Sequence, residues 1–408
     1  MTHNYHFPII HKINYPAAEQ WGIVKSIERP KGRGLVCLRQ DRTLVRLWRI
    51  EKISFLEESP AGYKMEQQDI NPVNDQQYQD NILMGVSRTF ALTIPQLPPD
   101  LSRVVGNGYL LCRIVDTVED EPALTPDQKR HFSQEFVRVV AGNASAYEFS
   151  NSLFSALSSS TTDEEKDLIK NVPAVIRITR SFSGIQQAAL LRCVQIMAEG
   201  MADFQQNGSP FGLKDMEEMD RYCYHVAGVV GEMLTTLFCD YSPRIARKQS
   251  QLESLAVSFG QALQMTNILK DIWDDRARGA CWLPQDIFLK SGFNLKDLSS
   301  SDYDPAFGEG IAGLLSISYV HLKNALSYIL LIPRNEQGIR RFCLWALGMA
   351  ILTLRRINRY RNFSESRHVK ISRRNVKATI FTCNITAFSN LSLRMLFYFL
   401  TRSLLKSQ

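Results

Sequence analysis

The sequence predicts an all-α protein in which long helices surround a central apolar space. From Tyr78 onward, apolar residues recur at helical spacing, and clusters of Gly, Pro, Ser and Asn separate the periodic segments. Convincing alternating strands are absent. Hydrophobic residues make up 45% of the 408 residues and charged residues 22%, so the chain can bury a large core. These observations predict one large helical domain over residues 65–375.

The first clearly periodic segment is residues 101–120, for which Pro98, Pro99 and Asp100 form a plausible helix start. Serine and threonine crowd residues 149–162, which predicts a surface loop at a helix junction. The other predicted helices cover residues 184–205, 215–239, 251–277, 312–331, 336–360 and 376–405.

Residues 1–64 differ from the rest of the chain, because they sustain neither helical nor strand periodicity. Met65 then opens a polar stretch before helical patterning starts, so we expect residues 1–64 to be an N-terminal extension outside the core fold. The chain does not open with charged residues followed by an apolar run, so we expect no secretory signal. Eight cysteines without CxxC pairs do not describe a disulfide framework, which indicates a reducing, cytoplasmic setting.

The net charge of +7 is unevenly distributed. Residues 1–64 carry +5 and residues 334–408 carry +13, which leaves −11 for residues 65–333. An acidic body with a basic, partly apolar tail is unlike a uniformly basic nucleic-acid binder, so we expect no nucleic acid partner. Such a tail suits anionic phosphates or lipid headgroups. On charge alone, a solvated basic helix fits equally well.

The segment 376–408 is a basic, apolar C-terminal helix. Polar and charged residues interrupt it at Asn384, Asn390, Arg394 and Arg402, whereas a spanning helix needs about 20 mostly apolar residues. An amphipathic helix lying on a membrane is therefore favoured over a spanning one. The alternative is a soluble helix that packs on the body of the protein.

Two acidic clusters carry the strongest chemical signal. One contains Asp116, Glu119 and Asp120, and the other contains Asp271, Asp274 and Asp275. Each places carboxylates at i, i+3 and i+4, which is one face of a helix, where they repel one another unless a cation lies between them. Oxygen-only ligands suit Mg²⁺, which binds few carboxylates and completes its shell with water and substrate phosphate. Two such helices facing each other would hold a diphosphate.

A single cluster of this kind is usually a solvated helix end. Two copies, each joined to an apolar helix, weaken that interpretation, and the flanking residues weaken it further. Hydroxyl, amide and cationic side chains that suit phosphate oxygens lie on the same helical stripes or just before them. They are Ser87, Arg88, Tyr109, Arg113, Gln264, Asn267 and Lys270.

These residues resemble the motifs of the squalene and phytoene synthase family. The matching segments are Ser87–Phe90, Asp116–Asp120, Tyr222–Gly228 and Asn267–Asp275, and their order and spacing agree over about residues 80–375. The resemblance implies an isoprenoid synthase-type helical fold around a deep apolar cavity. It also implies head-to-head condensation of two farnesyl diphosphates through a cyclopropyl intermediate. Metal ligands for Mg²⁺ would be Asp116, Glu119, Asp120, Asp271 and Asp275.

In this family the diphosphate would be held by Arg88, Arg113 and Lys270, together with Ser87, Gln264 and Asn267. Tyr222 is expected to serve the proton step, with Tyr109 sharing it. Phe342 would offer a π face to the carbocation. Two positions depart from the family pattern: Lys270 replaces an arginine, and Ala280 stands where an arginine is usual, although Arg276 and Arg278 are nearby.

The C-terminal part is most similar to squalene synthases, in which a lysine and an arginine hold NADPH before reduction to squalene. Lys370 matches the lysine directly, and the arginine falls on Ser372 without a gap or on Arg373 with a one-residue shift. A place in sterol or hopanoid biosynthesis would follow. We expect a monomer, cytoplasmic and either peripheral to a membrane or anchored by its C-terminal segment.

Two other functions remain open at this stage. A phytoene or dehydrosqualene synthase would run the same condensation without the reductive step, and product formation without NADPH would identify it. A catalytically inactive, membrane-associated assembly factor belongs to another class, and two complete acidic clusters argue against it.

Overall fold

A computed structural model of the chain describes residues 72–87, 89–207, 209–300 and 303–405. These residues belong to one compact unit, Asp69–Gln408, and they confirm the all-α prediction. In this part of the chain, the one β pairing is an isolated bridge between Leu213 and Pro284. Residues 1–64, predicted to be an extension outside the core, lie outside the described residues.

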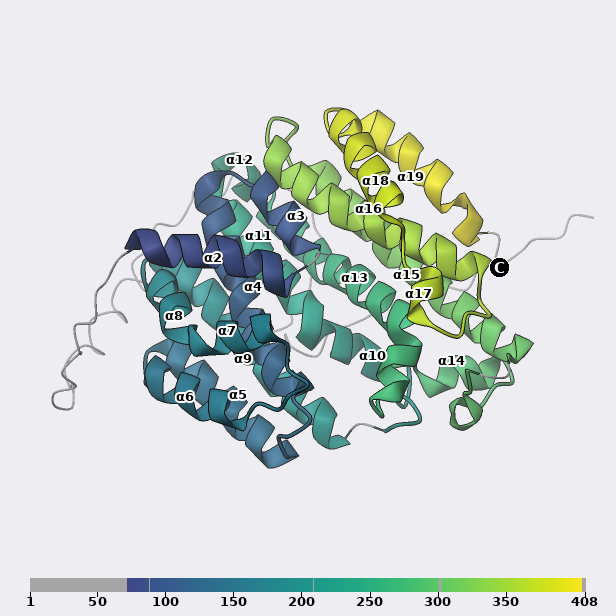
Figure 1. The fold of residues 1–408 in the computed structure, drawn as a ribbon. Helices are drawn as coiled ribbons and strands as arrows, with labels where there is room; N and C mark the ends of the chain where they lie inside the picture. Colours follow the sequence, from purple (N-terminus) through teal and green to yellow (C-terminus); the bar gives the residue numbers. More distant parts are fainter. Residues whose placement is uncertain (1–71, 88, 208, 301–302, 406–408) are drawn as a thin grey trace, which may run out of the picture. The chain divides into compact units, whose positions relative to one another are not determined.

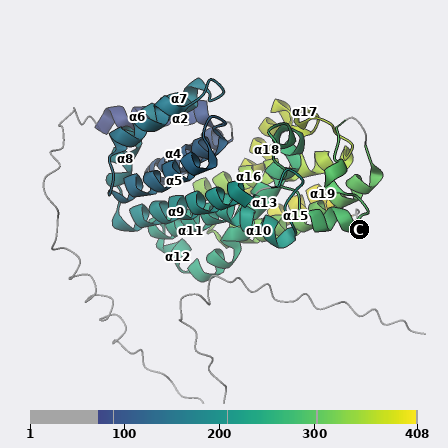
Figure 2. The same cartoon turned by 90° about the horizontal axis from the view of Figure 1, so that it is seen from below.

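Figures 1 and 2 show the helices from two directions. In chain order they are α2 (Pro72–Val86), α3 (Phe90–Thr93), η2 (Ile94–Gln96), α4 (Pro99–Asp120), α5 (Pro126–Ala141), α6 (Ala146–Ala156), α7 (Asp163–Lys170), α8 (Val172–Arg180), α9 (Gly184–Asn207), α10 (Met216–Cys223), η3 (Tyr224–Gly228), α11 (Val229–Tyr241), α12 (Pro243–Ala246), α13 (Gln249–Ala277), α14 (Gln285–Lys290), η4 (Leu295–Asp297), α15 (Pro305–Leu331), α16 (Gln337–Arg359), α17 (Ser366–Val369), α18 (Arg373–Thr386) and α19 (Asn390–Leu405).

The longest predicted helices are confirmed, with boundaries that differ by a few residues. Residues 101–120, 184–205, 251–277 and 336–360 correspond to α4, α9, α13 and α16. The predicted helix 312–331 is the second part of α15, which begins earlier, at Pro305. These segments were predictable because one side of each is buried in the core, so their apolar residues recur with the period of a helix.

Residues 215–239 were predicted as one helix, but they form α10, a π-helical turn and α11. The π turn, Tyr224–Gly228, inserts extra backbone where the chain passes α13. Two glycines lie in this contact. A Cβ at Gly231 would overlap the carbonyl oxygen of Ala256, and one at Gly260 would overlap that of Ala227. Both glycines therefore allow the backbones of α11 and α13 to approach closely.

The predicted loop at 149–162 is wrong in its first half, because α6 continues to Ala156. Phe149 and Leu153 are fully buried, and this packing outweighs the loop tendency of the nearby serines. Ser145 caps the start of α6, and Thr162 forms a capping box with Glu165 at the start of α7.

The C-terminal segment is a hairpin of α18 and α19 rather than one helix over 376–405, and both helices pack on the body of the protein (Figure 1). Arg340 of α16, which is fully buried, holds the hairpin in place. It donates hydrogen bonds to the carbonyl oxygens of Ala387 (2.8 Å), Ile329 (3.2 Å) and Ile332 (2.7 Å), and to Asn390 Oδ1 (2.8 Å).

The asparagines that interrupt the apolar pattern are thus partners of the body. Asn390 accepts from Arg340, and Asn384 Oδ1 accepts from Trp345 Nε1 at 3.1 Å. With 14 and 16 residues, α18 and α19 are each shorter than the roughly 20 residues of a spanning helix. Among the described residues, α15 alone is long and apolar enough to cross a membrane, and it packs against α13, α14, α16 and α19.

Candidate active site

The first acidic cluster lies in the last two turns of α4. Asp116 and Glu119 are partly buried and Asp120 is exposed. Burial raises the pKa of Asp116 to about 7, against the opposing effect of the Arg113 guanidinium. Burial also raises the pKa of Glu119 well above its usual range, and the carboxylates of Asp120 and Asp116 add to this shift. The cluster is therefore short of positive charge.

Glu121 follows the cluster but serves the helix end. Burial opposes its ionisation, yet hydrogen bonds from Thr161 and Ser158 and from the backbone of Ala123 lower its pKa to about 2. Its two oxygens are occupied by these donors, so Glu121 fixes the turn after α4 rather than joining the cluster.

The second acidic cluster lies at the end of α13. Asp271 is partly buried, Asp274 is exposed, and Asp275 is 9% exposed. Burial raises the pKa of Asp275 to about 6, although a hydrogen bond from Arg278 lowers it. α11 packs against both α4 and α13 and so links the two helices that carry the clusters.

Arg278 brings the two clusters together. Its Nη2 donates to Asp275 Oδ1 at 2.6 Å, and its Nη1 lies 3.5 Å from Asp120 Oδ1. One guanidinium thus contacts a carboxylate from each cluster. The predicted arrangement, in which two acidic helices face each other, is consistent with this geometry.

The other cations are paired with the clusters as well. Arg113 forms ion pairs with Asp116 (3.7 Å) and with Glu165 of α7. Lys270 Nζ lies 3.0 Å from Asp271 Oδ2 and donates to Asn267 Oδ1 at 3.2 Å. Each cluster therefore has one basic residue on its own helix within reach of a phosphate that binds there.

Tyr222 lies beside both clusters, at the end of α10. Its ring stacks on Trp282, with centroids 4.1 Å apart, and meets Phe204 edge to face. Burial raises the pKa of Tyr222 well above its usual range, and the carboxylates of Glu119, Asp275 and Asp116 raise it further. The hydroxyl keeps its proton at physiological pH.

Tyr109 in the middle of α4 lies close to Ser87, which follows α2. Tyr109 Oη donates to the carbonyl oxygen of Val86 at 2.9 Å, and its ring lies 5.3 Å from that of Phe90. The buried Ser87 accepts a hydrogen bond from the backbone of Phe90 at 2.9 Å. Arg88, predicted to bind phosphate, lies outside the described residues.

The remaining predicted residues are more dispersed. Gln264 is partly buried on α13, two helical turns before Asp271. Phe342 of α16 is 4% exposed and packs edge to face on Phe238, a core contact. Arg373 is exposed at the start of α18.

Lys370 lies beside the second cluster, where its Nζ is 3.9 Å from Asp274 Oδ2. Both line a polar cavity of about 560 Å³. The indole of Trp273, the cations Arg276 and Arg367, and the loop residues Ser299 and Ser300 also line it. The cavity thus combines an aromatic face with three basic side chains and two carboxylates, Asp274 and Glu365, which pair with Lys370 and Arg367.

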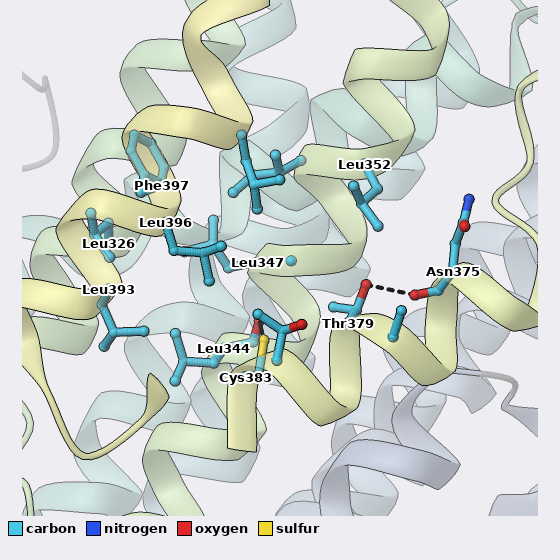
Figure 3. A pocket seen from close by; sticks show the side chains of 15 residues that line it. Leu326, Leu344, Leu347, Leu352, Asn375, Thr379, Cys383, Leu393, Leu396 and Phe397 are labelled. Carbon is cyan, nitrogen blue, oxygen red and sulfur yellow. Dashed lines mark hydrogen bonds between the residues drawn. The ribbon is translucent and has the colours of Figure 1, made fainter. Parts of the chain in front are cut away.

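A second cavity, of about 290 Å³, lies between α16 and the C-terminal hairpin (Figure 3). Leu344 and Leu347 point into it from α16, and Leu393, Leu396 and Phe397 from α19. No residue of the acidic clusters lines it. It is therefore not the central apolar space that the sequence predicts between the clusters. That central space stays a prediction.

The donor set fits Mg²⁺, although no three His, Cys, Asp or Glu side chains of the described residues converge into a ready-made metal site. Mg²⁺ does not need such a cage, because it binds through one or two carboxylates plus substrate phosphate and water. The pair Asp120 and Asp275 offers one carboxylate from each helix at the same cation.

Sequence reasoning missed two residues that lie close to the site. Glu165 comes from α7, far along the chain, and shares Arg113 with Asp116. Trp282 follows α13 and covers the ring of Tyr222. The capping pattern around Thr162 could have located the helix that carries Glu165, but no local pattern indicates either contact.

The fold and site define an all-α protein in which two carboxylate-bearing helices face each other beside a buried tyrosine. The family model of squalene/phytoene synthases matches residues 83–375. The chain belongs to this family.

Two curated relatives are similar over most of this chain. A squalene synthase of Gibberella zeae is 28% identical over 308 residues, which is 74% of this chain and 63% of the relative. The squalene synthase of Saccharomyces cerevisiae is 28% identical over 286 residues, covering 67% and 59%. The matched part of this chain thus spans about 60% of the length of these relatives.

Solved structures support the fold. A ligand complex of TcSQS superposes with a TM-score of 0.62 at 20% identity, covering 82% of this chain and 100% of that one. A dehydrosqualene synthase in complex with a ligand superposes with a TM-score of 0.54 at 18% identity, covering 77% and 96%. The isoprenoid synthase-type fold expected from the sequence is confirmed.

Proposed function

We propose that this protein joins two molecules of farnesyl diphosphate head to head through a cyclopropyl intermediate and reduces the product to squalene with NADPH. The observation that carries the proposal is the meeting of the two acidic clusters at Arg278, beside Tyr222, in a chain of the squalene/phytoene synthase family. The similarity of the chain to squalene synthases supports squalene as the product.

Mg²⁺ would be held by Asp116, Glu119 and Asp120 of α4 and by Asp271 and Asp275 of α13. When bound, it supplies Lewis-acid neutralisation of the diphosphate leaving group, so that the allylic C–O bond can ionise. The raised pKa values of Asp116 and Asp275 support this assignment, because carboxylates that lack enough positive charge gain most from a divalent cation.

The basic residues would bind and orient the diphosphates. Arg113 and Lys270 each touch a cluster carboxylate and can turn toward a phosphate oxygen that binds there. The amide of Asn267, which already contacts Lys270, and that of Gln264 extend this polar stripe along α13. Ser87, which follows α2, would contribute its hydroxyl, and Arg88 would contribute its guanidinium as the sequence predicts.

Tyr222 would move the proton. Its hydroxyl stays protonated because the side chain is buried near carboxylates, so it cannot act as a free phenolate base. The Oη atom can accept the proton lost on cyclopropane closure while it passes its own proton to an oxygen of the released diphosphate. Tyr109, which faces Ser87, would share this role, and Phe342 would belong to the apolar wall that excludes water from the cation.

The polar cavity at Lys370 would take the NADPH. Lys370, Arg367 and Arg276 can meet its phosphates, and the Trp273 indole offers a flat surface for an aromatic ring. Arg373 begins the next helix, α18, and would extend the basic rim. The cavity adjoins Asp274, so the cofactor would bind next to the second acidic cluster.

The C-terminal hairpin would lie on a membrane. α18, α19 and the turn between them expose large apolar side chains: Phe381 and Ile385 on α18, Phe388 in the turn, and Leu391, Met395, Tyr398 and Phe399 on α19. The sequence from Ser366 to Gln408 contains no Asp or Glu but eight Lys and Arg, which suits anionic headgroups. Arg402 lies over the Phe399 ring.

The activity test uses purified protein with farnesyl diphosphate and Mg²⁺, with and without NADPH, and mass spectrometry of the hydrocarbon extract. Squalene that forms only with NADPH supports the proposal. Dehydrosqualene as the final product, even with NADPH, would indicate the enzyme without the reductive step. Phytoene from a longer diphosphate would overturn the substrate assignment, and no turnover of either substrate would indicate the inactive assembly factor.

The membrane test is sedimentation with vesicles of phosphatidylcholine containing about one third phosphatidylserine. Replacing Phe381 and Leu391 together by serine should weaken the affinity for the vesicles by at least about a hundredfold, because each buried apolar side chain contributes about 1.5–3 kcal/mol and every 1.4 kcal/mol is a factor of ten. Ile185, 58% exposed on α9, provides the control, since Ile185→Ser should leave binding unchanged. Equal loss in both variants would contradict the hairpin as the docking face.

A further inference from the structure

Arg278 occupies an unusual position at the end of α13. Its backbone closes the helix, since its N–H donates to the carbonyl oxygen of Asp275 at 3.0 Å. Its side chain reaches back to Asp275 and across to Asp120 of the other cluster. The side chain is 62% exposed, whereas that of Asp275 is 12% exposed. A mostly exposed cation therefore pairs with a largely buried carboxylate.

The influence of Arg278 extends beyond its two contacts. The Asp271 carboxylate helps to raise the pKa of Arg278, against the effect of burial. The guanidinium in turn is one of two cations that oppose the raised pKa of Glu119. Four carboxylates from two helices thus share the field of one monovalent side chain.

We propose that Arg278 is a built-in counter-ion that holds the two acidic clusters together in the absence of metal and competes with a divalent cation for Asp120 and Asp275. This inference rests on the proposed function in taking the clusters as metal ligands. Arg278 is a positioning residue: it keeps the carboxylates of α4 and α13 at one place until a doubly charged ion replaces it.

Electrostatics explains why the exchange is possible. A guanidinium and a divalent cation repel each other strongly when both lie within a few ångströms, so they cannot share the same two carboxylates. Arg278 can move into water at little cost, because its head group is already mostly exposed, whereas the largely buried Asp275 carboxylate then needs the incoming cation as its new partner. The carboxylates cannot leave, because they are fixed on long helices.

Arg276 offers a matched control. It carries the same charge two residues earlier, but its Nη1 donates to the carbonyl oxygen of Pro210 at 3.0 Å. Loss of Arg276 changes the net charge as much as loss of Arg278 does. A difference in Mn²⁺ affinity between the two variants therefore measures the effect of the contacts of Arg278 with Asp120 and Asp275 and not that of the net charge of the protein.

The experiment measures Mn²⁺ binding to the full-length, metal-free protein by electron paramagnetic resonance, without substrate. Arg278→Gln should bind Mn²⁺ about tenfold more tightly than the wild type, because a hydrogen bond to a charged group that must be broken is lost. Arg276→Gln should stay within about twofold. Arg278→Lys keeps the charge without the bidentate fork and should fall between.

A second readout concerns the metal-free protein. Arg278→Gln should melt at a lower temperature than Arg276→Gln, since the facing carboxylates lose their shared cation, and added Mn²⁺ should remove the difference. Unchanged or weaker Mn²⁺ binding in Arg278→Gln would overturn the proposal, as would equal effects of the two variants. If Arg278→Gln fails to fold, Arg278→Lys decides by the same comparison.

The outcomes separate this inference from the proposed function. A protein that makes no hydrocarbon from farnesyl diphosphate, yet binds Mn²⁺ more tightly as Arg278→Gln, would contradict the function and support the counter-ion. Normal squalene formation, with the same Mn²⁺ affinity in the wild type and in Arg278→Gln, would support the function and contradict the counter-ion. Absence of Mn²⁺ binding in the wild type and in every variant would overturn both.

Discussion

Arg340 and Arg278 each place a positive charge in a different region of this protein, and the two charges have different kinds of partner. Arg340 is fully buried and donates to backbone carbonyl oxygens near the C-terminal ends of α15 and α18, where the helix dipoles are negative. Arg278 is mostly exposed and contacts the carboxylates of Asp120 and Asp275. The partners of Arg340 are neutral oxygens of the backbone and of the Asn390 amide, whereas those of Arg278 are anions that a metal ion also prefers.

The difference separates a structural cation from an exchangeable one. The carbonyl oxygen of Ile329 also accepts from the backbone N–H of Ile332, but those of Ala387 and Ile332 depend on Arg340, so this contact stabilises the fold whether or not a ligand is bound. The cluster carboxylates can exchange one cation for another without unfolding, because the head group of Arg278 is mostly exposed. Loss of the Arg340 charge should therefore lower the stability of the hairpin, whereas loss of a cluster carboxylate should lower activity.

The largest expected effect is on catalysis. Asp271→Asn removes one negative charge from the second cluster but keeps the size of the side chain. Squalene formation should fall by about 10³-fold, comparable to the loss of one electrostatic group in other active sites. The far-ultraviolet circular dichroism spectrum and the melting temperature should remain close to those of the wild type. An active Asp271→Asn protein would remove the basis for a catalytic role of this cluster.

The next effect is on stability. Arg340→Met fills similar space but leaves the carbonyl oxygens of Ala387, Ile329 and Ile332 without this donor. The hydrogen bond to Asn390 Oδ1 is lost as well, so we expect the free energy of unfolding to fall by about 4 kcal/mol, roughly 1 kcal/mol for each of the four hydrogen bonds. Guanidinium denaturation measures it, and hydrogen exchange should show α18 and α19 opening first. A variant as stable as the wild type would mean that apolar packing alone holds the hairpin.

The smallest effect concerns pH. The pKa of Asp116 is raised in the folded protein to about 7, above its ordinary value of 3.8, so the folded state binds this proton more tightly than the unfolded state. Stability therefore falls as pH rises from about 4 to 7. In metal-free protein, Asp116→Asn should stabilise the fold more at pH 7.5 than at pH 5.5, by up to about 2 kcal/mol. Thermal melts at both pH values measure this.

A gain for Asp116→Asn that is equal at both pH values would point to altered packing rather than to ionisation. Added Mn²⁺ should reverse the order, because it stabilises the wild type and not the variant. Arg340→Met should show no such dependence on pH or metal, which keeps the two regions distinct.

The sequence predicted the long helices and both acidic clusters because these are local patterns. Apolar spacing marks α4, α9, α13 and α16, and the carboxylates repeat at helical steps within a few residues. The short helices α5 to α8 escaped notice because their apolar faces are only two or three turns long. Boundaries such as the first turn of α15 depend on packing more than on local composition.

The missed contacts are all between distant segments. Nothing near Arg340 indicates that it will bind the turn at Ala387, and nothing near Asn390 indicates that it will accept from Arg340. The pairing of Arg113 with Glu165 also joins two separate helices. Local periodicity cannot reveal such partners, since they are fixed only when the helices have packed.

The π turn at Tyr224–Gly228 limits how the chain length can vary in this region. Deleting one residue from this turn would restore the regular hydrogen-bond ladder of an α-helix and leave the helices on either side nearly in register, because the turn accommodates one extra residue. Deleting a residue between the turn and Gly231 would instead rotate the following segment by about 100° and place Glu232 against the backbone of Ala256, where even a methyl group has no room. A single-residue deletion should therefore be tolerated within the π turn and rare in the first residues of α11.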